Sequence, residues 1–400
     1  MDHIIFFDFD SHDRLLPLTL TRPVSELRLG ILTIREKWAL LFESASFSHI
    51  TTEALEPLFP ISIQDENILI NSAAIPSRSL QYLIADLALN EALMLDGELI
   101  AARLPRQQFE YLLRGGDLED ITGFELEQDI QIIRNLWELP NLSKAQISED
   151  LALMSREDKD HPKGLEVKGD HTVFVHPTAK VDSAILNAEE GPIYIGKEAW
   201  IMDGSILRGP IAIGDGSVVR MGSKLFGGTV VGPKCVVGGE IKNSTLLGYS
   251  NKAHEGYLGD SMIGEWCNLG ALTSNSNVRN TLSSVQVWNH AKSVREDSGQ
   301  MKCGVFMGDY CRTGIHAQLG AGSVIGVSCH LYGQGFCRPF VPSFTWGGMD
   351  SMATYDLEKA IQVSILSQAS KGRILEQVHR GLLRRIYQES QTDRANFPDS

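Results

Sequence analysis

The strongest constraint on the fold is an aliphatic side chain that recurs at every sixth position in the second half of the chain. Eight successive positions follow this period: Ile195, Ile201, Leu207, Ile213, Val219, Leu225, Val231 and Val237. Neither an α-helix nor a flat strand repeats every six residues. A triangular prism does, because each of its sides takes one hexapeptide and turns one side chain inward, so that stacked coils bury an apolar column. The sequence therefore predicts a left-handed parallel β-helix.

Two interruptions divide this repeat. Strict phase is lost over residues 238–257, and residues 275–304 leave the pattern with a strand-like run at 285–288. Between and after them the inward positions are expected at Tyr257, Ile263 and Leu269, then at Met307, Thr313, Leu319, Ile325 and Leu331. Loops that leave a rigid scaffold commonly carry binding groups. The alternative is that these segments only cover a prism face or a subunit contact.

The first 155 residues have a different pattern. Strands expected at residues 4–9 and 68–70 alternate with helices expected at 24–42, 80–93 and 106–113, which predicts a Rossmann-like α/β domain. Two further helices are expected at 355–366 and 372–389. We therefore expect an α/β domain at 1–155, a linker at 156–170, the β-helix at 171–345 and a C-terminal helical segment at 346–400.

Composition narrows the class of protein. The net charge of −14 argues against a nucleic-acid partner, which needs clustered Lys and Arg. No apolar run has membrane-spanning length, and the first residues lack the pattern of a secretory signal, so we expect a cytoplasmic protein. The cysteines contain no CxxC pair, and we expect reduced, buried thiols instead of disulfides or a zinc site. They are Cys235, Cys267, Cys303, Cys311, Cys329 and Cys337.

Short segments in the second half resemble the acetyltransferase domain of the bifunctional N-acetylglucosamine-1-phosphate uridyltransferase/glucosamine-1-phosphate acetyltransferase family, over about residues 171–335. The run 254–260, His-Glu-Gly-Tyr-Leu-Gly-Asp, resembles that family's H-x-x-Y-x-G-D segment, and 240–242 resembles its E-x-K segment. The run 268–271 resembles its N-x-G-A segment. Single residues that match further positions are Asn277, Lys302 and, in an R-P-G-like segment, Arg220.

The resemblance implies acetyl transfer from acetyl-CoA to glucosamine-1-phosphate or a related amino-sugar phosphate. The attacking amine must be unprotonated, and His254 would be the general base, since histidine titrates near neutral pH. Glu240 would orient His254, and Asn277 would position the amine. The substrate-binding residues would be Arg220, Lys242 and Lys302 for the phosphate and Tyr257 and Asn268 for the sugar.

Simpler interpretations stay open for some of these residues. Lys242 and Lys302, taken singly, would be solvated charges, and Tyr257 also occupies an expected inward position of the repeat. His316 and His330 fit core or interface positions, and together with His290 they do not have the spacing of a three-histidine zinc site.

The segment 14–23 resembles the R-L-x-P-L-T-x-x-x-P segment of sugar nucleotidyltransferases. Three features depart from that family: the loop 10–13 has no glycine, Val24 stands at the lysine position, and Ala73 stands at the metal-binding aspartate. The same opening, the run 30–38 and the pairing of domains resemble a variant bacterial group of bifunctional uridyltransferase/acetyltransferases.

A working nucleotide site in this domain would need other groups. Arg14, Arg22, Arg28 and Lys37 would neutralise the phosphates of UTP, and the candidates for a Mg²⁺ ligand are Asp8, Asp10 and Asp13. The alternative is that these residues are helix-surface charges and caps in a domain retained for assembly.

Three functions therefore compete. The first is acetyl transfer at the β-helix, with or without uridylyl transfer that forms UDP-N-acetylglucosamine. The second is a sugar-1-phosphate nucleotidyltransferase whose β-helix serves only assembly or regulation, and the third is a non-enzymatic scaffold. Prisms of this type usually pair their faces around a threefold axis, so we expect a homotrimer that binds acetyl-CoA between neighbouring subunits.

Overall fold

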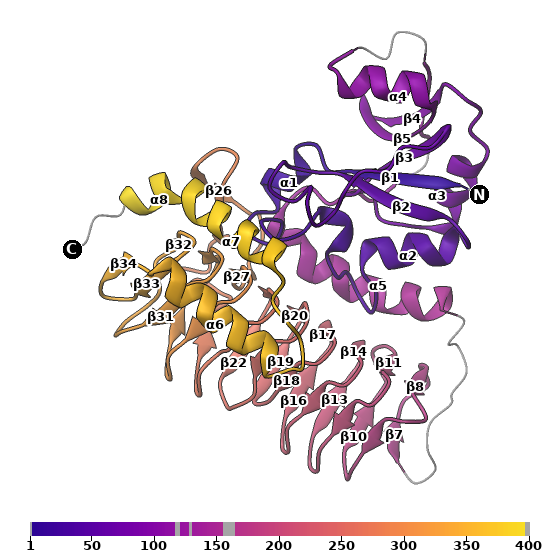
Figure 1. Ribbon diagram of the computed structural model, residues 1–400. Helices are drawn as coiled ribbons and strands as arrows, with labels where there is room; N and C mark the ends of the chain where they lie inside the picture. The colour runs from indigo at the N-terminus through magenta and orange to yellow at the C-terminus, as the bar shows by residue number, and fades with distance from the viewer. Residues whose placement is uncertain (1, 117–120, 128–129, 155–164, 397–400) are drawn as a thin grey trace. The chain divides into compact units, whose positions relative to one another are not determined.

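The computed structural model describes residues 2–116, 121–127, 130–154 and 165–396. Within these residues the chain forms two compact units, which we call unit 1 and unit 2. Unit 1 contains residues 1–15, 22–27 and 32–135, and unit 2 contains residues 16–21, 28–31 and 136–400. Two short segments of the N-terminal region thus group with unit 2. Figure 1 shows the stacked coils of the β-helix that makes up most of this unit.

Unit 1 is built on a six-stranded sheet with the order β2-β1-β3-β5-β4-β6. The strands are β1 (His3–Phe7), β2 (Ser46–Ile50), β3 (Glu66–Asn71), β4 (Glu91–Leu95), β5 (Glu98–Pro105) and β6 (Thr122–Glu125). The helices are α1 (Ser11–Arg14), α2 (Ile34–Leu41), α3 (Arg78–Ala85) and α4 (Arg106–Leu113). Strand β1 is parallel to both of its neighbours, whereas β5 is antiparallel to β3 and β4. This arrangement confirms the predicted Rossmann-like domain.

Two of the three helices predicted in this domain are only partly correct. The predicted helix at 24–42 is a 3₁₀ turn at Val24–Glu26 and then α2, with an interruption at Gly30, whose φ is +91°. A Cβ at Gly30 would lie 2.5 Å from the Asp150 carboxylate, so no side chain fits there. The predicted helix at 80–93 ends with α3, and the chain continues as β4. The helix predicted at 106–113 is confirmed as α4.

Unit 2 contains the predicted parallel β-helix, whose strands form three faces. The first face contains β7 (Glu166–Lys168), β10 (Ile185–Asn187), β13 (Ile206–Arg208), β16 (Lys224–Phe226), β19 (Glu240–Lys242) and β22 (Tyr257–Gly259). The second face contains β8 (Val173–Val175), β11 (Ile193–Ile195), β14 (Ile211–Ile213), β17 (Thr229–Val231), β20 (Thr245–Leu246), β23 (Met262–Ile263), β27 (Phe306–Met307), β30 (Val324–Ile325) and β32 (Phe340–Val341). The third face contains β9 (Lys180–Val181), β12 (Trp200–Ile201), β15 (Val218–Val219), β18 (Val236–Val237) and β21 (Asn251–Lys252).

The regular coils take 18 residues, because Ile193 pairs with Ile211 and Ile211 with Thr229. All eight positions of the unbroken repeat are buried, from Ile195 to Val237. Toward the C-terminus the strands are β24 (Ser274–Asn275), β28 (Arg312–Thr313), β29 (Gln318–Leu319), β31 (His330–Tyr332), β33 (Thr345–Gly348) and β34 (Met352–Thr354). The hexapeptide period therefore predicted both the architecture and the residues that fill its core.

The first interruption comes from tighter corners. Val230 pairs with Thr245, fifteen residues later, so this coil is shorter than the regular ones. The shorter corners change which residue points inward, and the predicted inward position at Tyr257 is wrong: Leu258 is buried in the core, whereas Tyr257 is half-buried. Tyr257 is therefore available on the outside of the prism.

The second interruption is an insertion between β23 and β27, where Met262 pairs with Phe306. It carries an antiparallel hairpin of β25 (Gln286–Asn289) and β26 (Val294–Asp297), close to the predicted strand. The Trp288 ring stacks on Phe340 of the second face with centroids 4.7 Å apart.

Helices cover parts of the prism. α5 (Leu139–Leu153) contacts β14 and β17, and α6 (Leu357–Ala369) bonds through Gln368 to the Tyr310 hydroxyl at 2.8 Å. α7 (Gln377–Glu389) and α8 (Gln391–Ala395) follow. The domain boundaries differ from the prediction in two places. α5 groups with the β-helix, and β7, within the predicted linker at 156–170, pairs with β10 as the first strand of its face. Residues 155–164 lie outside the described residues.

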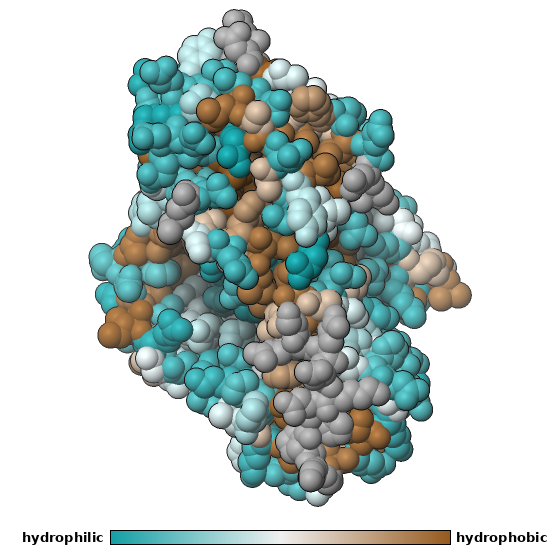
Figure 2. Space-filling model, turned by 90° about the vertical axis from the view of Figure 1, so that its right-hand side faces the viewer, coloured by the Kyte–Doolittle hydropathy of each residue, from teal (hydrophilic) through white to brown (hydrophobic). Residues whose placement is uncertain are grey.

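The hydropathy of the surface and the burial of the cysteines are those expected from the composition of the chain. Hydrophilic side chains predominate on the face shown in Figure 2, with apolar ones interspersed. Among the described residues, no helix is both long enough and apolar enough to span a membrane. All six cysteines are buried and unpaired, as predicted.

Candidate functional site

His254 lies on the corner that joins β21 of the third face to β22 of the first face, and its side chain is exposed. The corner is tight. Gly256 has a φ of +125°, and a Cβ there would lie only 2.2 Å from the carbonyl oxygen of Thr273 in the next coil. Only glycine fits this position, so close packing between coils fixes the main chain that carries His254.

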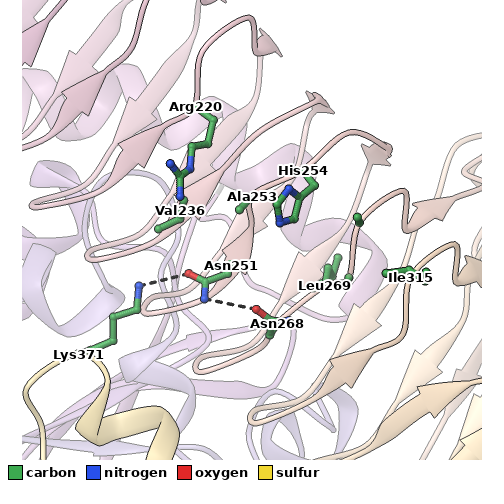
Figure 3. A pocket seen from close by; sticks show the side chains of 11 residues that line it. Arg220, Val236, Asn251, Ala253, His254, Asn268, Leu269, Ile315 and Lys371 are labelled. Atoms are coloured by element: carbon green, nitrogen blue, oxygen red, sulfur yellow. Dashed lines mark hydrogen bonds between the residues drawn. The ribbon is translucent and has the colours of Figure 1, made fainter.

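Three of the predicted residues line one pocket on the third face: His254, Arg220 and Asn268 (Figure 3). Arg220 follows β15, and Asn268 pairs with Asn251 of β21 one coil earlier. Residues from successive coils thus meet because each coil repeats the position of the one before it.

Lys371 also lines this pocket, and the sequence did not predict it. It lies between α6 and α7. Its Nζ donates to the main-chain oxygen of Lys234 at 2.9 Å and to Asn251 Oδ1 at 3.2 Å, and Asn251 Nδ2 donates to Asn268 Oδ1 at 3.4 Å (Figure 3). Burial lowers the pKa of Lys371. This lysine reaches the pocket because the C-terminal helices pack against the β-helix. No short sequence motif around Lys371 predicts this position.

Lys252 is a second residue that sequence reasoning missed. Its side chain is only 1% exposed and occupies a core position in register with Val237. The Nζ donates to the main-chain oxygens of His254 at 2.5 Å and Gly238 at 3.2 Å. Burial lowers the pKa of Lys252 to about 8. The ammonium therefore holds the main chain of the His254 corner from inside the prism.

Tyr257 and Asn277 are in direct contact, in a polar group that includes Asp260. Asn277 Nδ2 donates to the Tyr257 hydroxyl at 3.0 Å and to Asp260 Oδ2 at 2.5 Å, and Asn243 Nδ2 donates to Asp260 Oδ1 at 2.8 Å. Burial, then the charges of Asp260 and Glu240, raise the pKa of Tyr257. Tyr257 therefore keeps its proton at neutral pH and can act as a hydrogen-bond donor.

The other predicted residues of the β-helix are less closely tied to His254. Glu240 is half-buried and pairs in register with Tyr257, but no hydrogen bond joins it to His254 within the described part of the chain. Lys242 and Lys302 are exposed, and Lys242 Nζ lies 6.0 Å from the centre of the Phe226 ring. Their predicted roles toward the substrate stay predictions.

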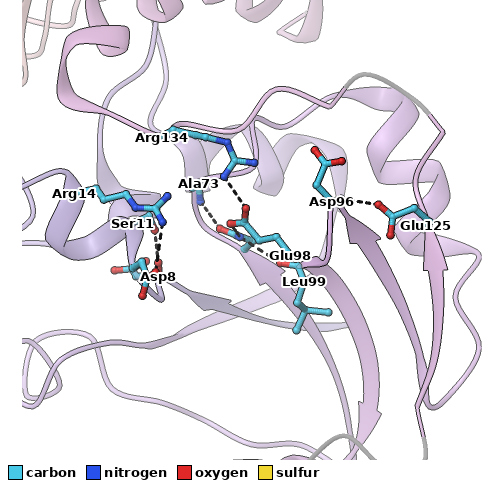
Figure 4. A network of polar contacts seen from close by, with 11 residues as sticks. Asp8, Ser11, Arg14, Ala73, Asp96, Glu98, Leu99, Glu125 and Arg134 are labelled. Atoms are coloured by element: carbon cyan, nitrogen blue, oxygen red, sulfur yellow. Dashed lines mark hydrogen bonds and ion pairs between the residues drawn. The ribbon is translucent and has the colours of Figure 1, made fainter. Parts of the chain in front are cut away.

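In unit 1, polar groups gather at the edge of the sheet where β1 and β3 end (Figure 4). Asn71 Nδ2 donates to Glu98 Oε1 at 3.1 Å, and Arg134 Nη1 donates to Glu98 Oε2 at 2.7 Å. Asp8 follows β1. Its Oδ2 accepts from the main-chain N–H of Val24 at 3.1 Å, and its Oδ1 is buried without a hydrogen-bond partner.

The three predicted metal candidates do not form one ligand set. Asp10 is exposed and pairs with Arg14 at 3.4 Å, and Asp13 is exposed on α1. Among the described residues, no group of three or more His, Cys, Asp and Glu side chains is arranged to hold a metal ion. Asp8 is therefore the one candidate of the three with a buried oxygen still available.

The four predicted phosphate-binding cations have different surroundings. Arg14 is half-buried, whereas Arg22 and Lys37 are buried within unit 1 and are not surface charges. Arg28 groups with unit 2, where its Nε donates to the main-chain oxygen of Leu247 at 3.3 Å and its Nη1 to that of Ile31. Arg28 therefore belongs to a different unit from Arg14, Arg22 and Lys37.

Comparison with known proteins gives two kinds of relatives. Residues 4–159 match the family model described as sugar nucleotidyl transferase. The bifunctional sugar-1-phosphate nucleotidylyltransferase/acetyltransferase of Sulfurisphaera tokodaii is 38% identical over 93 residues, which cover 23% of each chain. The bifunctional protein GlmU of Methanocaldococcus jannaschii is 38% identical over 92 residues, which cover 23% of this chain and 22% of the relative. The match thus spans less than a quarter of the length of either relative.

Solved structures that match part of this chain include a Francisella novicida UDP-N-acetylglucosamine acyltransferase. It is 15% identical, covers 56% of this chain and 87% of its own, and has a TM-score of 0.31. The polysialic-acid-specific acetyltransferase NeuO is 11% identical, covers 52% of this chain and 97% of its own, and has a TM-score of 0.28. Residues 4–159 of this chain thus match the sugar nucleotidyl transferase family model, and a parallel β-helix follows them along the chain.

Proposed function

We propose that this protein transfers the acetyl group of acetyl-CoA to the amine of glucosamine-1-phosphate or a related amino-sugar phosphate, with His254 as the general base. The observation that carries the proposal is the pocket that holds His254 together with Arg220 and Asn268. It combines a base, a cation that can bind phosphate in a bidentate way, and an amide that can bond to sugar hydroxyls.

The chemistry needs few groups. The imidazole of His254 takes a proton from the amine as its nitrogen attacks the thioester carbonyl, and a C–N bond forms. The tetrahedral intermediate then breaks its C–S bond, and the thiolate of CoA leaves and accepts the proton from the imidazolium. Main-chain N–H groups at the prism corners would polarise the carbonyl oxygen. Tyr257 and Asn268 would bond to the sugar, Asn277 would position the amine, and Glu240 would orient the base.

The experiment is thiol release from acetyl-CoA with glucosamine-1-phosphate. We expect wild type to turn over and His254→Ala to lose at least about a hundredfold in kcat/KM. His171→Ala is the control, because His171 is also an exposed histidine of unit 2 but does not line the pocket. An inactive wild type against a panel of amino-sugar phosphates, or an active His254→Ala variant, would overturn the proposal.

A second activity, uridylyl transfer by unit 1, is favoured by the family match at residues 4–159. Mg²⁺ is usually held by one or two carboxylates together with substrate phosphates. The buried, unpartnered Oδ1 of Asp8 fits one such ligand, and the ion would neutralise the charge of the triphosphate. Arg14, which is half-buried, would bind the phosphates, whereas the buried Arg22 and Lys37 would contribute only their positive charge.

Pyrophosphate release from UTP and N-acetylglucosamine-1-phosphate tests this second activity. We expect a Mg²⁺-dependent rate in wild type that falls at least about tenfold in Asp8→Asn, which keeps an oxygen for the Val24 N–H but removes the charge. Asp13→Asn on the exposed side of α1 is the control. No pyrophosphate release with UTP would contradict uridylyl transfer by unit 1.

We further propose a homotrimer in which neighbouring subunits share acetyl-CoA. Exposed apolar side chains beside the pocket support an interface there, since Ile315 is 72% and Met221 70% exposed. Light scattering at micromolar concentration should give three times the mass of the chain. A monomer at that concentration would contradict the shared site.

A further inference from the structure

The pocket beside His254 has an unusual charge for this chain. Its ionisable lining residues are Arg220, His254 and Lys371, and no Asp or Glu among the described residues lines it. The whole chain has 50 acidic and 36 basic residues, so this local excess of cations runs against the overall charge. The volume of about 420 Å³ suits a small molecule. A pocket of this kind selects anions by its local field.

Lys371 is held in place but not neutralised. Its Nζ donates to two neutral oxygens, the main chain of Lys234 at 2.9 Å and Asn251 Oδ1 at 3.2 Å. An ammonium has three donors, so one remains for a ligand. Within the described residues, no carboxylate forms an ion pair with Lys371.

Arg220 lies on another side of the same pocket. Figure 3 shows Arg220 above Asn251, and the Lys371 ammonium beside Asn251 and joined to it by a hydrogen bond. The side chain of Arg220 makes no ion pair within the described part of the chain, and its Cβ packs near Gly238. Two cations without acidic partners in one concave site match the charge and the acceptor number of a phosphate group.

We propose that Lys371 and Arg220 form an anion subsite that binds a substrate phosphate, so that the C-terminal helical segment supplies part of the binding site. This inference rests on the proposed function and adds the residue that completes its phosphate site. The phosphate is either that of the acceptor sugar or one of those of CoA. In either case Lys371 binds the ligand and takes no part in the proton transfers at His254.

The kinetic test uses Lys371→Met, which keeps the length of the side chain but removes its charge. We expect KM for the phosphate-bearing substrate to rise about tenfold, the loss of one charge-assisted hydrogen bond, with kcat within about twofold of wild type. Lys371→Arg should restore most of the affinity. Lys359→Met is the matched control, since Lys359 is an exposed lysine of α6 outside the pocket.

Substrate analogues identify the source of the phosphate. If the subsite binds CoA, Lys371→Met raises KM for acetyl-CoA but not for 3′-dephospho-acetyl-CoA. If it binds the acceptor, the variant raises KM for glucosamine-1-phosphate but not for glucosamine. KM values within twofold of wild type for both phosphorylated substrates, or equal losses with and without the phosphate, would overturn the subsite.

Calorimetric titration separates this inference from the proposed reaction. CoA and glucosamine-1-phosphate are titrated into the full chain of wild type, Lys371→Met and Lys371→Arg. Weaker binding of either ligand to Lys371→Met alone would support the subsite even if wild type shows no turnover. Equal binding by all three proteins, or binding of neither ligand by wild type, would overturn it. Thermal unfolding of each variant checks that the fold is intact.

Discussion

A charged side chain inside an apolar column is costly, and Lys252 is such a side chain. Its ammonium replaces the aliphatic group that the repeat puts in register with it at Val237, and bonds to two carbonyl oxygens at the His254 corner. Burial lowers its pKa to about 8 in the folded protein, against 10.5 for an ordinary lysine. The protein thus retains a buried cation at the corner that carries the proposed base.

The lowered pKa of Lys252 predicts how stability depends on pH. Below pH 8 the lysine is charged in both states, so the full cost of burying the charge is present. Between pH 8 and 10.5 the folded protein is neutral at Lys252 and the unfolded chain is charged, so unfolding takes up a proton. The contribution of Lys252 to the free energy of unfolding therefore rises with pH in this window, by at most about 1.4 kcal/mol per pH unit.

Denaturant unfolding at pH 7, 8, 9 and 9.5 measures this effect. Wild type should gain stability relative to Lys252→Met as the pH rises above 8, and Lys224→Met, at an exposed lysine of the first face, should show no such difference. Parallel pH curves for wild type and Lys252→Met would mean that the lysine is not titrating in the folded state.

Tyr257 gives a second prediction at this scale. Tyr257→Phe removes the hydroxyl that accepts from Asn277 and should cost about 1 kcal/mol of stability. If the hydroxyl also bonds to the sugar, KM for the acceptor rises several-fold while KM for acetyl-CoA is unchanged. Tyr332→Phe, on an exposed tyrosine, is the control. An unchanged acceptor KM would leave Tyr257 with a purely structural role.

Sequence reasoning located the residues that belong to the repeat and missed those that depend on distant packing. Arg220, His254 and Asn268 meet because successive coils stack on one another in register, so residues that are far apart along the chain form a cluster in space. Lys371 reaches the same pocket only through the docking of the C-terminal helices. Lys252 was missed because a charged residue at an inward position contradicts the pattern that identifies such positions.

At the scale of elements, the corners of the prism determine where functional side chains point. Gly256→Ala should cost at least about 2 kcal/mol, because its φ is +125° and the new Cβ would lie 2.2 Å from Thr273 O. It should also lower kcat, since His254 shares the corner. Gly222→Ala is a matched control: its φ is +72° but nothing lies within 4 Å, so only backbone strain of about 1 kcal/mol remains. Equal melting temperatures for the two variants would contradict this explanation.

An element was predicted correctly where its pattern of apolar residues continues over enough positions to exclude other structures. Eight hexapeptides in phase leave one architecture, and the helix at Arg106–Leu113 was predicted with its bounds. The helices predicted at 24–42 and 80–93 were too long because apolar spacing continued across a turn. Gly30 at φ +91° and Asn90 at φ +64° lie in the non-helical segments that interrupt these two ranges, and hydrophobic spacing alone does not reveal a left-handed residue.

At the scale of the whole molecule, the sequence boundary between domains is not a boundary between compact units. α5 lies before the predicted linker, yet its Ser143 hydroxyl is 3.1 Å from Thr245 of β20, and Asn141 accepts a hydrogen bond from Asn243. A chain cut to residues 171–400 would lack α5 and β7.

We therefore expect this truncated chain to melt at least about 5 °C below the full-length protein and to aggregate, since the apolar surface under α5 would be exposed. Thermal unfolding followed by light scattering measures both effects. A truncated chain as stable and soluble as the full-length one would mean that α5 contributes nothing to the β-helix.

The membership of residues 16–21 and 28–31 in unit 2 has a consequence for biosynthesis. These segments emerge from the ribosome near the start of translation, whereas the coils that Thr21 and Arg28 contact, at Asp309 and Leu247, are synthesised much later. The connection between the first strand and the first long helix, which contains residues 16–21 and 28–31, therefore cannot reach its final structure while only unit 1 has been synthesised. Because the chain is synthesised from its N-terminus, these N-terminal segments can make their final contacts only after the β-helix has been synthesised. A nascent chain stalled before about residue 310 would therefore lack the later coils and would also leave these N-terminal segments without their partners.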